Sequence, residues 1–409
     1  MQYSQYRILW FGTLLAFLAF QMSRTAQGIV AFDLEGTNGA VGLVATGQGA
    51  SMLFIAPFGG VIADRLSKRR LLLGGQTTIG LVFLTLGVLI LTDAINIVWL
   101  TLGMFTMGVA FSFLGPARQA YVADLVPTKS LGNAVALSQL AGTFARVLGP
   151  MLAGVLIGIG FISSGGTYLF MAALFVIVLA TLWQLPPARP NRDISQTSVL
   201  ADLRAGIQHI RQRPGLRILV IGFIFIVTLG FPFQNILPGL TENEFGRQST
   251  DIALLLTVSA IAGIIVSFIA AGTVTTRWAW PMMLGTGALL GGSLILLAIA
   301  PSYGWAFPAM MLVGAGQAGF RMVNNALLLT EADPAYHGRV MSLTMIAFGI
   351  EGLSSLPIGL IADEIGERWV LAILGAATVG VVALAALAYS GTRGQTTPAP
   401  DPNPNPETA

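Results

Sequence analysis

Long apolar runs dominate the chain and set the first limit on its fold. Each covers about 20 residues, the length that an α-helix needs to cross a hydrocarbon core of about 30 Å. The runs are continuous and do not alternate between polar and apolar residues, so they predict helices and not barrel strands. Twelve runs lie at about 8–31, 41–63, 71–92, 96–117, 131–160, 166–185, 216–238, 251–274, 280–300, 303–326, 339–362 and 368–389.

The composition requires a membrane around such a fold. Only 10% of the 409 residues are charged and 55% are hydrophobic, whereas a soluble domain carries about a quarter charged residues. Too few polar side chains are present to cover a surface in water, so the lipid bilayer must cover it. The net charge of +3 does not indicate a nucleic-acid surface, and the absence of cysteine excludes disulfides and thiol chemistry.

A polar break near the middle separates six runs from the next six. Within it, Val199, Leu203 and Ile207 recur at helical spacing, which predicts a short amphipathic helix at the membrane surface. The tail after residue 390 is rich in proline and is expected to be disordered. We therefore expect an N-terminal six-helix half at 1–185, a cytoplasmic linker at 186–215, a C-terminal six-helix half at 216–390 and a tail at 391–409.

Basic residues gather in alternate loops. One set of loops holds the cluster around Lys68 and six arginines between positions 189 and 217. The opposite loops hold only Arg247 and Arg368 beside many carboxylates. Because cytoplasmic loops are enriched in Lys and Arg, both termini are predicted to lie in the cytoplasm, with the protein in a bacterial-type inner or plasma membrane.

The fifth and eleventh runs resemble each other. "LVPTKSLGNAVALSQLAGTFARVLGPMLAGVL" and "EADPAYHGRVMSLTMIAFGIEGLSSLPIGLI" both begin at a proline turn and carry a proline deep inside, Pro150 and Pro357, with an offset of about 207 residues. Parallel halves of six helices are typical of secondary transporters. The sequence therefore predicts an all-α membrane fold with twelve transmembrane helices in two six-helix halves.

The loop after the second run makes the resemblance more specific. Its residues Gly60, Asp64, Arg65, Lys68 and Arg69 resemble the loop motif of the major facilitator superfamily, although Ser67 stands where the family usually has glycine. "GPARQAYVADLVPTKSLGNAVAL" and "HGRVMSL" are similar to the drug and siderophore exporter branch, which includes macrolide efflux proteins. The resemblance covers nearly the whole chain and implies the twelve-helix fold, proton antiport and a gating role for the loop motif.

The same loop residues have a physical reason to act as a gate. Asp64 could accept hydrogen bonds from the N-terminus of a neighbouring helix, where the helix dipole favours a negative charge. Arg65 and Arg69 could pair with acidic residues of the other half, in contacts that break when the gate opens. The alternative is that the basic residues, Lys68 and Arg70 among them, only fix the topology.

Glycines in the fifth run form a second candidate motif. Gly142, Gly149, Pro150 and Gly154 resemble, incompletely, the Gly-Pro motif associated with antiporters. Small residues let a membrane helix bend and approach a neighbour closely. Ordinary helix packing would explain the same pattern.

Charges inside the apolar runs are the strongest candidates for function, since each costs at least ~2.5 kcal/mol at the bilayer centre. Arg24, Arg146 and Glu351 meet this condition, and the repeat places Arg146 close to the position of Glu351 in the opposite half. Apolar surroundings favour a protonated carboxyl group and a nearby arginine favours the ionised form, so Glu351 is the expected proton carrier. A structural ion pair is the alternative, Arg24 could snorkel outward, and Arg118 and Arg321 are expected at the membrane interface.

Amide and aromatic side chains could line a central cavity suited to amphipathic solutes rather than to sugars, which need dense hydrogen bonding. They could instead hold helices together. The candidates are Gln21, Gln48, Phe113, Gln139, Phe231, Gln234, Asn235, Gln317, Asn324 and Asn325.

No residue pattern indicates an enzyme. Neither lysine, Lys68 or Lys129, follows a glycine as a phosphate-binding loop requires, and the two histidines, His209 and His337, lie far apart. We expect no cofactor, no metal site and no nucleic-acid partner. The sequence predicts a monomeric secondary transporter that exports a hydrophobic or amphipathic small-molecule substrate against protons. An uptake carrier or uniporter, or a non-transporting receptor or structural protein, remain the alternatives.

Overall fold

The described residues of the computed structural model are 3–65, 67–158, 162–186, 199–271, 278–333 and 336–393, and they contain helices and turns but no strand. The N-terminal half consists of α1 (Ser4–Glu35), α2 (Asn38–Arg65), α3 (Lys68–Leu91), α4 (Ile97–Leu125), α5 (Thr128–Gly158) and α6 (Ser163–Trp183). Next come α7 (Val199–Gln212), α8 (Pro214–Gly230), α9 (Phe233–Gly239), a π-helical turn (Leu240–Glu244), a 3-10 turn (Ser249–Asp251), α10 (Ile252–Ala271), α11 (Ala279–Ala298), α12 (Tyr303–Glu331), α13 (His337–Ile365) and α14 (Glu367–Arg393).

The predicted runs coincide with these helices, with one exception. The run at about 216–238 is divided, because α8 ends at Gly230 and α9 begins at Phe233. Pro232 lies in the break and has no amide hydrogen to donate to a continuous helix. Among the described residues, ten segments are long and apolar enough to cross a membrane, and the glycine-containing helices α2 and α12 fall outside that set.

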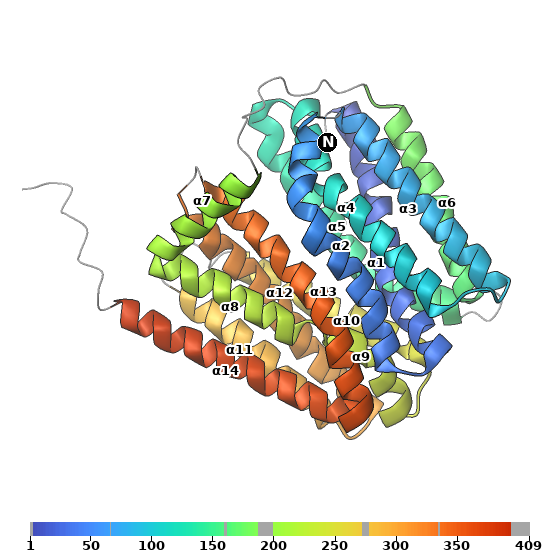
Figure 1. The fold of residues 1–409 in the computed structure, drawn as a ribbon, viewed down its shortest axis with the longest axis vertical. Helices are drawn as coiled ribbons and strands as arrows, with labels where there is room; N and C mark the ends of the chain where they lie inside the picture. Colours follow the sequence, from blue (N-terminus) through green and yellow to red (C-terminus); the bar gives the residue numbers. More distant parts are fainter. Residues whose placement is uncertain are drawn as a thin grey trace, which may run out of the picture.

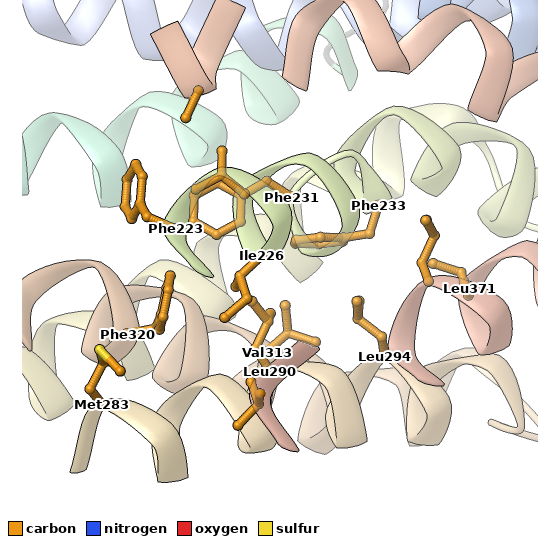
Figure 2. Packing of buried hydrophobic residues seen from close by; sticks show 14 of the residues in the cluster. Phe223, Ile226, Phe231, Phe233, Met283, Leu290, Leu294, Val313, Phe320 and Leu371 are labelled. Carbon is orange, nitrogen blue, oxygen red and sulfur yellow. The ribbon is translucent and has the colours of Figure 1, made fainter. Parts of the chain in front are cut away.

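Each half has its own apolar core. In the N-terminal half, the ring of Phe83 packs edge-on against Phe175, with ring centroids 5.4 Å apart. In the C-terminal half, Phe223 of α8 stacks on Phe320 of α12 at 6.0 Å. Figure 2 shows this core, to which α8 contributes Phe223 and Ile226 and α11 contributes Leu290. Two separate cores allow the halves to move relative to each other while each stays packed.

The halves meet along α2 with α13 and α5 with α10 (Figure 1). Glycine is required where these backbones cross. A Cβ atom on Gly49 of α2 would lie 2.5 Å from the Cα atom of Gly352 in α13. A Cβ atom on Gly154 of α5 would likewise collide with the Cβ atom of Ala253 in α10. Such small residues let helices of opposite halves touch without a gap.

One end of the molecule is sealed by hydrogen bonds between the halves, and we call it the closed end. There Asp363, near the end of α13, accepts from the backbone amides of Asn38 at 2.7 Å and Gly39 at 2.8 Å. The amide nitrogens of Asn38 and Asn243 donate to the buried carboxylate of Glu367 at 3.0 and 2.7 Å. The N-terminus of α2 is thus bound by carboxylates from the other half.

Different contacts occur at the opposite end, which carries the α2–α3 turn and α7. Lys68 pairs with Asp124 at 2.8 Å within the N-terminal half. Arg213 pairs with Asp333 at 2.6 Å within the C-terminal half. Both pairs can therefore persist when the halves change their relative orientation.

The predicted linker and tail are only partly described. Helix α7 coincides with the predicted amphipathic helix and packs against α13, where His209 stacks on Tyr336 at 4.1 Å. Helix α14 continues to Arg393, three residues beyond the predicted boundary at 390. Residues 187–198 and 394–409 lie outside the described part of the chain. The domain boundaries and the disorder of the tail stay predictions.

Candidate substrate site

A cavity of about 310 Å³ lies between the two halves. Helices α1 and α5 form one wall, and Phe231 after the end of α8 forms the other together with α9, α10, α12 and α13. The lining residues are Phe20, Gln21, Arg24, Thr25, Gln27, Gly28, Thr143, Arg146, Pro150, Phe231, Gln234, Asn235, Ile252, Leu256, Ser259, Ala260, Gly263, Ile264, Ser267, Gly314, Gln317, Ala318, Arg321, Phe348 and Glu351.

All three charges that the sequence places inside apolar runs reach this cavity. Glu351 is 9% exposed, while Arg24 and Arg146 are solvent-exposed within the cavity. The carboxylate of Glu351 interacts electrostatically with Arg24 of the opposite half. Arg24 also lies close enough to Arg146 for their charges to repel. The outward snorkelling of Arg24 is therefore wrong, and Arg24 rather than Arg146 is the guanidinium that acts on Glu351.

The backbone around Glu351 is fixed by contacts with both halves. The hydroxyl groups of Ser354 and Ser355 donate to the Glu351 carbonyl oxygen at 2.7 and 3.0 Å. Across the interface, Thr46 of α2 donates to the carbonyl oxygen of Gly352 at 3.0 Å. Because Gly352 also touches α2, any separation of the halves at this level moves Glu351 relative to α1.

Two other arginines, which the sequence places near the ends of membrane helices, have neighbours within the protein. Arg321 of α12 lines the cavity. Arg118 of α4 lies inside the N-terminal half, beside α1, α3 and α6, with its guanidinium 4.8 Å from the centre of the Phe17 ring. An aromatic face can hold a cation in such a position. In both cases helix packing directs the side chain toward protein, and the expected position at the membrane interface stays a prediction.

The structure also divides the predicted amide and aromatic residues. Gln21, Phe231, Gln234, Asn235 and Gln317 line the cavity. Gln48, Phe113, Gln139, Asn324 and Asn325 do not belong to its lining. Asn324 is fully buried, and neither atom of its amide group has a hydrogen-bond partner among the described residues.

The loop motif is described only in part. Lys68 donates to both carboxylate oxygens of Asp124, and Arg69 donates to the carbonyl oxygens of Leu182 and Trp183 at the end of α6. The expected pairing of Arg69 with the other half is therefore wrong for this conformation. The side chains of Asp64 and Arg65, and the surroundings of Gly60, lie outside the described residues. The gating role stays a prediction.

The glycines of the α5 motif have unequal surroundings. Gly149 lies against Gln21 of α1, since a Cβ atom there would collide with the Cβ atom of Gln21. Gly154 contacts α10 of the other half, whereas Gly142 has ordinary space around it. Pro150 lines the cavity. The motif thus brings two helices close to α5, but its antiport role stays a prediction.

Sequence reasoning missed the carboxylates of the closed end. From the sequence, Asp363 and Glu367 were interpreted only as charged residues in a loop. One sequence signal could have found them. The two acidic residues are only four positions apart at the junction of two apolar runs, and an asparagine stands at the start of another run. Their pairing with Asn38 depends on how the two halves dock, which no local pattern contains.

Comparison with known proteins decides the family. Residues 9–352 match the model of the Major Facilitator Superfamily. The chain belongs to this superfamily. It is 26% identical over 339 residues to the staphyloferrin A transporter of Staphylococcus aureus, covering 80% of this chain and 82% of the relative. It is 22% identical over 374 residues to the multidrug efflux pump Tap of Mycobacterium bovis, covering 88% and 87%.

A solved structure has the same fold. The inward-facing, occupied structure of a bacterial homologue of the human lysosomal transporter Spinster aligns with a TM-score of 0.78 at 15% identity, over 96% of this chain and 98% of that one. The superfamily resemblance drawn from the loop motif is therefore confirmed, together with the two-half helical fold. The protein is a membrane transporter, as are these relatives.

Proposed function

We propose that this transporter couples the export of a hydrophobic or amphipathic small molecule to the entry of protons. The observation that carries the proposal is the position of Glu351. It is the only carboxylate among the described residues that line the cavity, and it faces Arg24 across the interface between the halves. One proton on this carboxylate would remove an attraction between the two halves.

Coupling then follows from geometry. Glu351 belongs to α13 and Arg24 to α1, so the strength of their interaction depends on the relative position of the halves. Ionised Glu351 stabilises arrangements that keep it near Arg24, whereas protonated Glu351 does not. A conformational equilibrium that changes the distance between these groups is therefore linked to proton binding.

The lining supports an amphipathic solute. The lining contains the aromatic rings of Phe20, Phe231 and Phe348 together with amide groups such as those of Gln21 and Gln317. Binding sites of this kind bury apolar surface and fix orientation with a few polar groups. The names of the two relatives, a siderophore transporter and a multidrug efflux pump, support a small-molecule substrate.

An uptake carrier is the second candidate, and one observation favours it. The lining has more arginines than carboxylates. A proton on Glu351 would release Arg24 to bind an anionic solute, so proton and solute would then cross together. The direction of solute movement relative to an imposed proton gradient separates the two candidates.

Flux measurements in proteoliposomes test the coupling. With the purified protein reconstituted and a pH gradient imposed, solute should move against the proton flow and should accumulate only while the gradient lasts. The E351Q variant should lose this gradient-driven transport and keep solute binding, because the amide has nearly the same shape but cannot release a proton. E351D should keep partial activity.

A matched control and three contrary results make the test decisive. E364Q removes an exposed carboxylate at the closed end and should transport normally. Gradient-driven accumulation that survives in E351Q would refute the assignment of Glu351. Solute movement in the direction of the protons would favour uptake, and movement unaffected by the gradient would indicate a uniporter.

A further inference from the structure

The cavity lining carries more positive than negative charges. Three arginines and one glutamate are the charged residues that the described lining contains. Glu351 can balance only one guanidinium, so two positive charges remain in the middle of the molecule. Charges at this depth are costly unless they pair with an opposite charge or reach water, and they typically mark a substrate or ion pathway.

The cavity arginines differ from other arginines of the chain in their hydrogen bonding. Arg213 and Arg368 donate to carbonyl oxygens and form ion pairs with carboxylates. Within the described part of the chain, no hydrogen bond or ion pair within 4.0 Å engages the guanidinium groups of Arg24, Arg146 or Arg321. Their donors remain available to a molecule that enters the cavity.

Arg24 and Arg146 are arranged as a pair. They lie on adjacent helices, α1 and α5, which are held together where Gly149 contacts Gln21. Their charges repel each other, and both side chains are exposed within the cavity. An anion between them would remove this repulsion. A guanidinium presents parallel N–H donors that match a carboxylate or a phosphate, so this wall suits an oxyanion.

The facing wall carries an apolar patch beside its polar and charged residues, which include Gln317, Arg321 and Glu351. Phe231 and Phe348 lie together with ring centroids 6.4 Å apart, and α10 contributes Ile252, Leu256 and Ile264. A molecule that spans the cavity would thus meet Arg24 and Arg146 on one side and this apolar patch on the other. Burial of an apolar chain against such a wall is favourable in proportion to its area.

We propose that the substrate is an anionic amphiphile, with a carboxylate or phosphate bound by Arg24 and Arg146 and an apolar body packed against Phe231, Phe348 and α10. The proposal rests on the proposed role of this cavity as the substrate site. It does not depend on the direction of transport. The same geometry disfavours cationic drugs, because an ammonium group would add a like charge to a cavity that already holds an excess of arginines.

Three probes that differ only in their end group test the proposal. They are a dansyl-labelled fatty acid, its primary amide and the corresponding alkylamine. Binding to the transporter in phosphatidylcholine nanodiscs is followed by dansyl fluorescence excited through the protein's tryptophans, at a pH where the acid and the amine are both charged. The acid should bind about tenfold more tightly than the amide, since a hydrogen bond to a charged group contributes that much, and the amine should bind most weakly.

Substitutions locate the effect. R24Q and R146Q should each weaken binding of the fatty acid about tenfold, while binding of the amide should change less than about twofold, which also shows that the variant is folded. R204Q, which removes an exposed arginine of α7, should leave all three affinities unchanged. Equal affinities of the three probes for the unmodified protein, or a preference for the acid that survives in both cavity variants, would overturn the proposal.

A second version of the binding experiment, with an anionic lipid in the nanodisc, identifies the source of the anionic ligand. Phosphatidylglycerol in the nanodisc should weaken binding of the fatty acid if the membrane's own anionic lipid enters the site, and should have no effect if the substrate comes from solution. Both results retain an anionic amphiphile as the ligand. The binding assay needs no proton gradient. If the protein binds anions selectively but shows no gradient-driven flux, only the proposed proton coupling is rejected. If it shows gradient-driven flux but no preference for anions, only the proposed anionic substrate is rejected.

Discussion

The carboxylate of Asp363 should control opening of the closed end. It joins the halves by accepting from the backbone amides of Asn38 and Gly39 at 2.7 and 2.8 Å, and from the side-chain amide of Asn38 at 3.0 Å. These donors belong to the N-terminus of α2, where the helix dipole adds to the attraction. The D363N variant keeps the shape of the side chain but replaces one acceptor oxygen with a donor and removes the charge.

The size of the effect follows from these contacts. A hydrogen bond to a charged group contributes roughly 1.5–3 kcal/mol when buried, but Asp363 is exposed and solvent screening reduces this value. We therefore expect D363N to destabilise the closed end by about 1–2 kcal/mol. This corresponds to an increase of about 5- to 30-fold in the ratio of open to closed states at that end.

Distance measurements between spin labels provide the assay. The chain has no cysteine, so cysteines can be introduced at the exposed positions Glu35 and Ser302, which lie in opposite halves at the closed end. The parent protein should give mainly a short distance by double electron–electron resonance, and D363N should add a longer one. E364Q, which removes a neighbouring exposed carboxylate, is the control.

Two results would refute this reasoning. One is an unchanged distance distribution in a D363N protein that is folded and monodisperse. The other is an equal shift in D363N and E364Q, because the loss of negative charge alone would then explain the opening and the specific hydrogen bonds would not.

Three further perturbations test other parts of the structure. G352A should favour the longer distance in the same assay, because overpacking at the α2 contact costs about 1–3 kcal/mol, whereas G380A, with open space around it, should not. A single cysteine at Ser67 should react with an impermeant thiol reagent only from the cytoplasmic side. Labelling by reagent added outside intact cells would show that the predicted orientation is wrong. D124N should lower the melting temperature because it leaves Lys68 without its carboxylate, at a cost of about 1 kcal/mol after solvent screening. Adding K68M to D124N should restore part of the lost stability.

Most of the fold could be predicted because the membrane imposes it. A helix that crosses the hydrocarbon core needs a fixed length and must satisfy its own backbone hydrogen bonds. The positions of the apolar runs therefore locate the helices directly. Even the one failure has a local cause, since Pro232 interrupts the run that becomes α8 and α9.

The candidate site could be predicted only as a set of charges. The sequence places Arg24 inside one apolar run and Arg118 at the end of another, but it does not show that Arg24 lines the cavity or that Arg118 packs over Phe17 inside the N-terminal half. Apolar residues face both lipid and protein in such helices, so the pattern of hydrophobicity says little about which side faces inward. The sequence therefore indicated the position of each charged residue along its helix, but not whether its side chain faces the cavity, the protein interior or the lipid.

The sequence by itself determined where the apolar helices lie along the chain, their division into two sets by a central polar break and the presence of a carboxylate within the eleventh run. These properties depend on residues close together in the chain and on the thickness of the bilayer. Only the tertiary structure decided that Arg24 faces Glu351, that Asp363 binds the start of α2 and that unpaired guanidinium groups share one cavity. Each of these contacts joins residues more than a hundred positions apart or on separate helices, and it exists only because glycines such as Gly49 and Gly352 let the two halves dock closely.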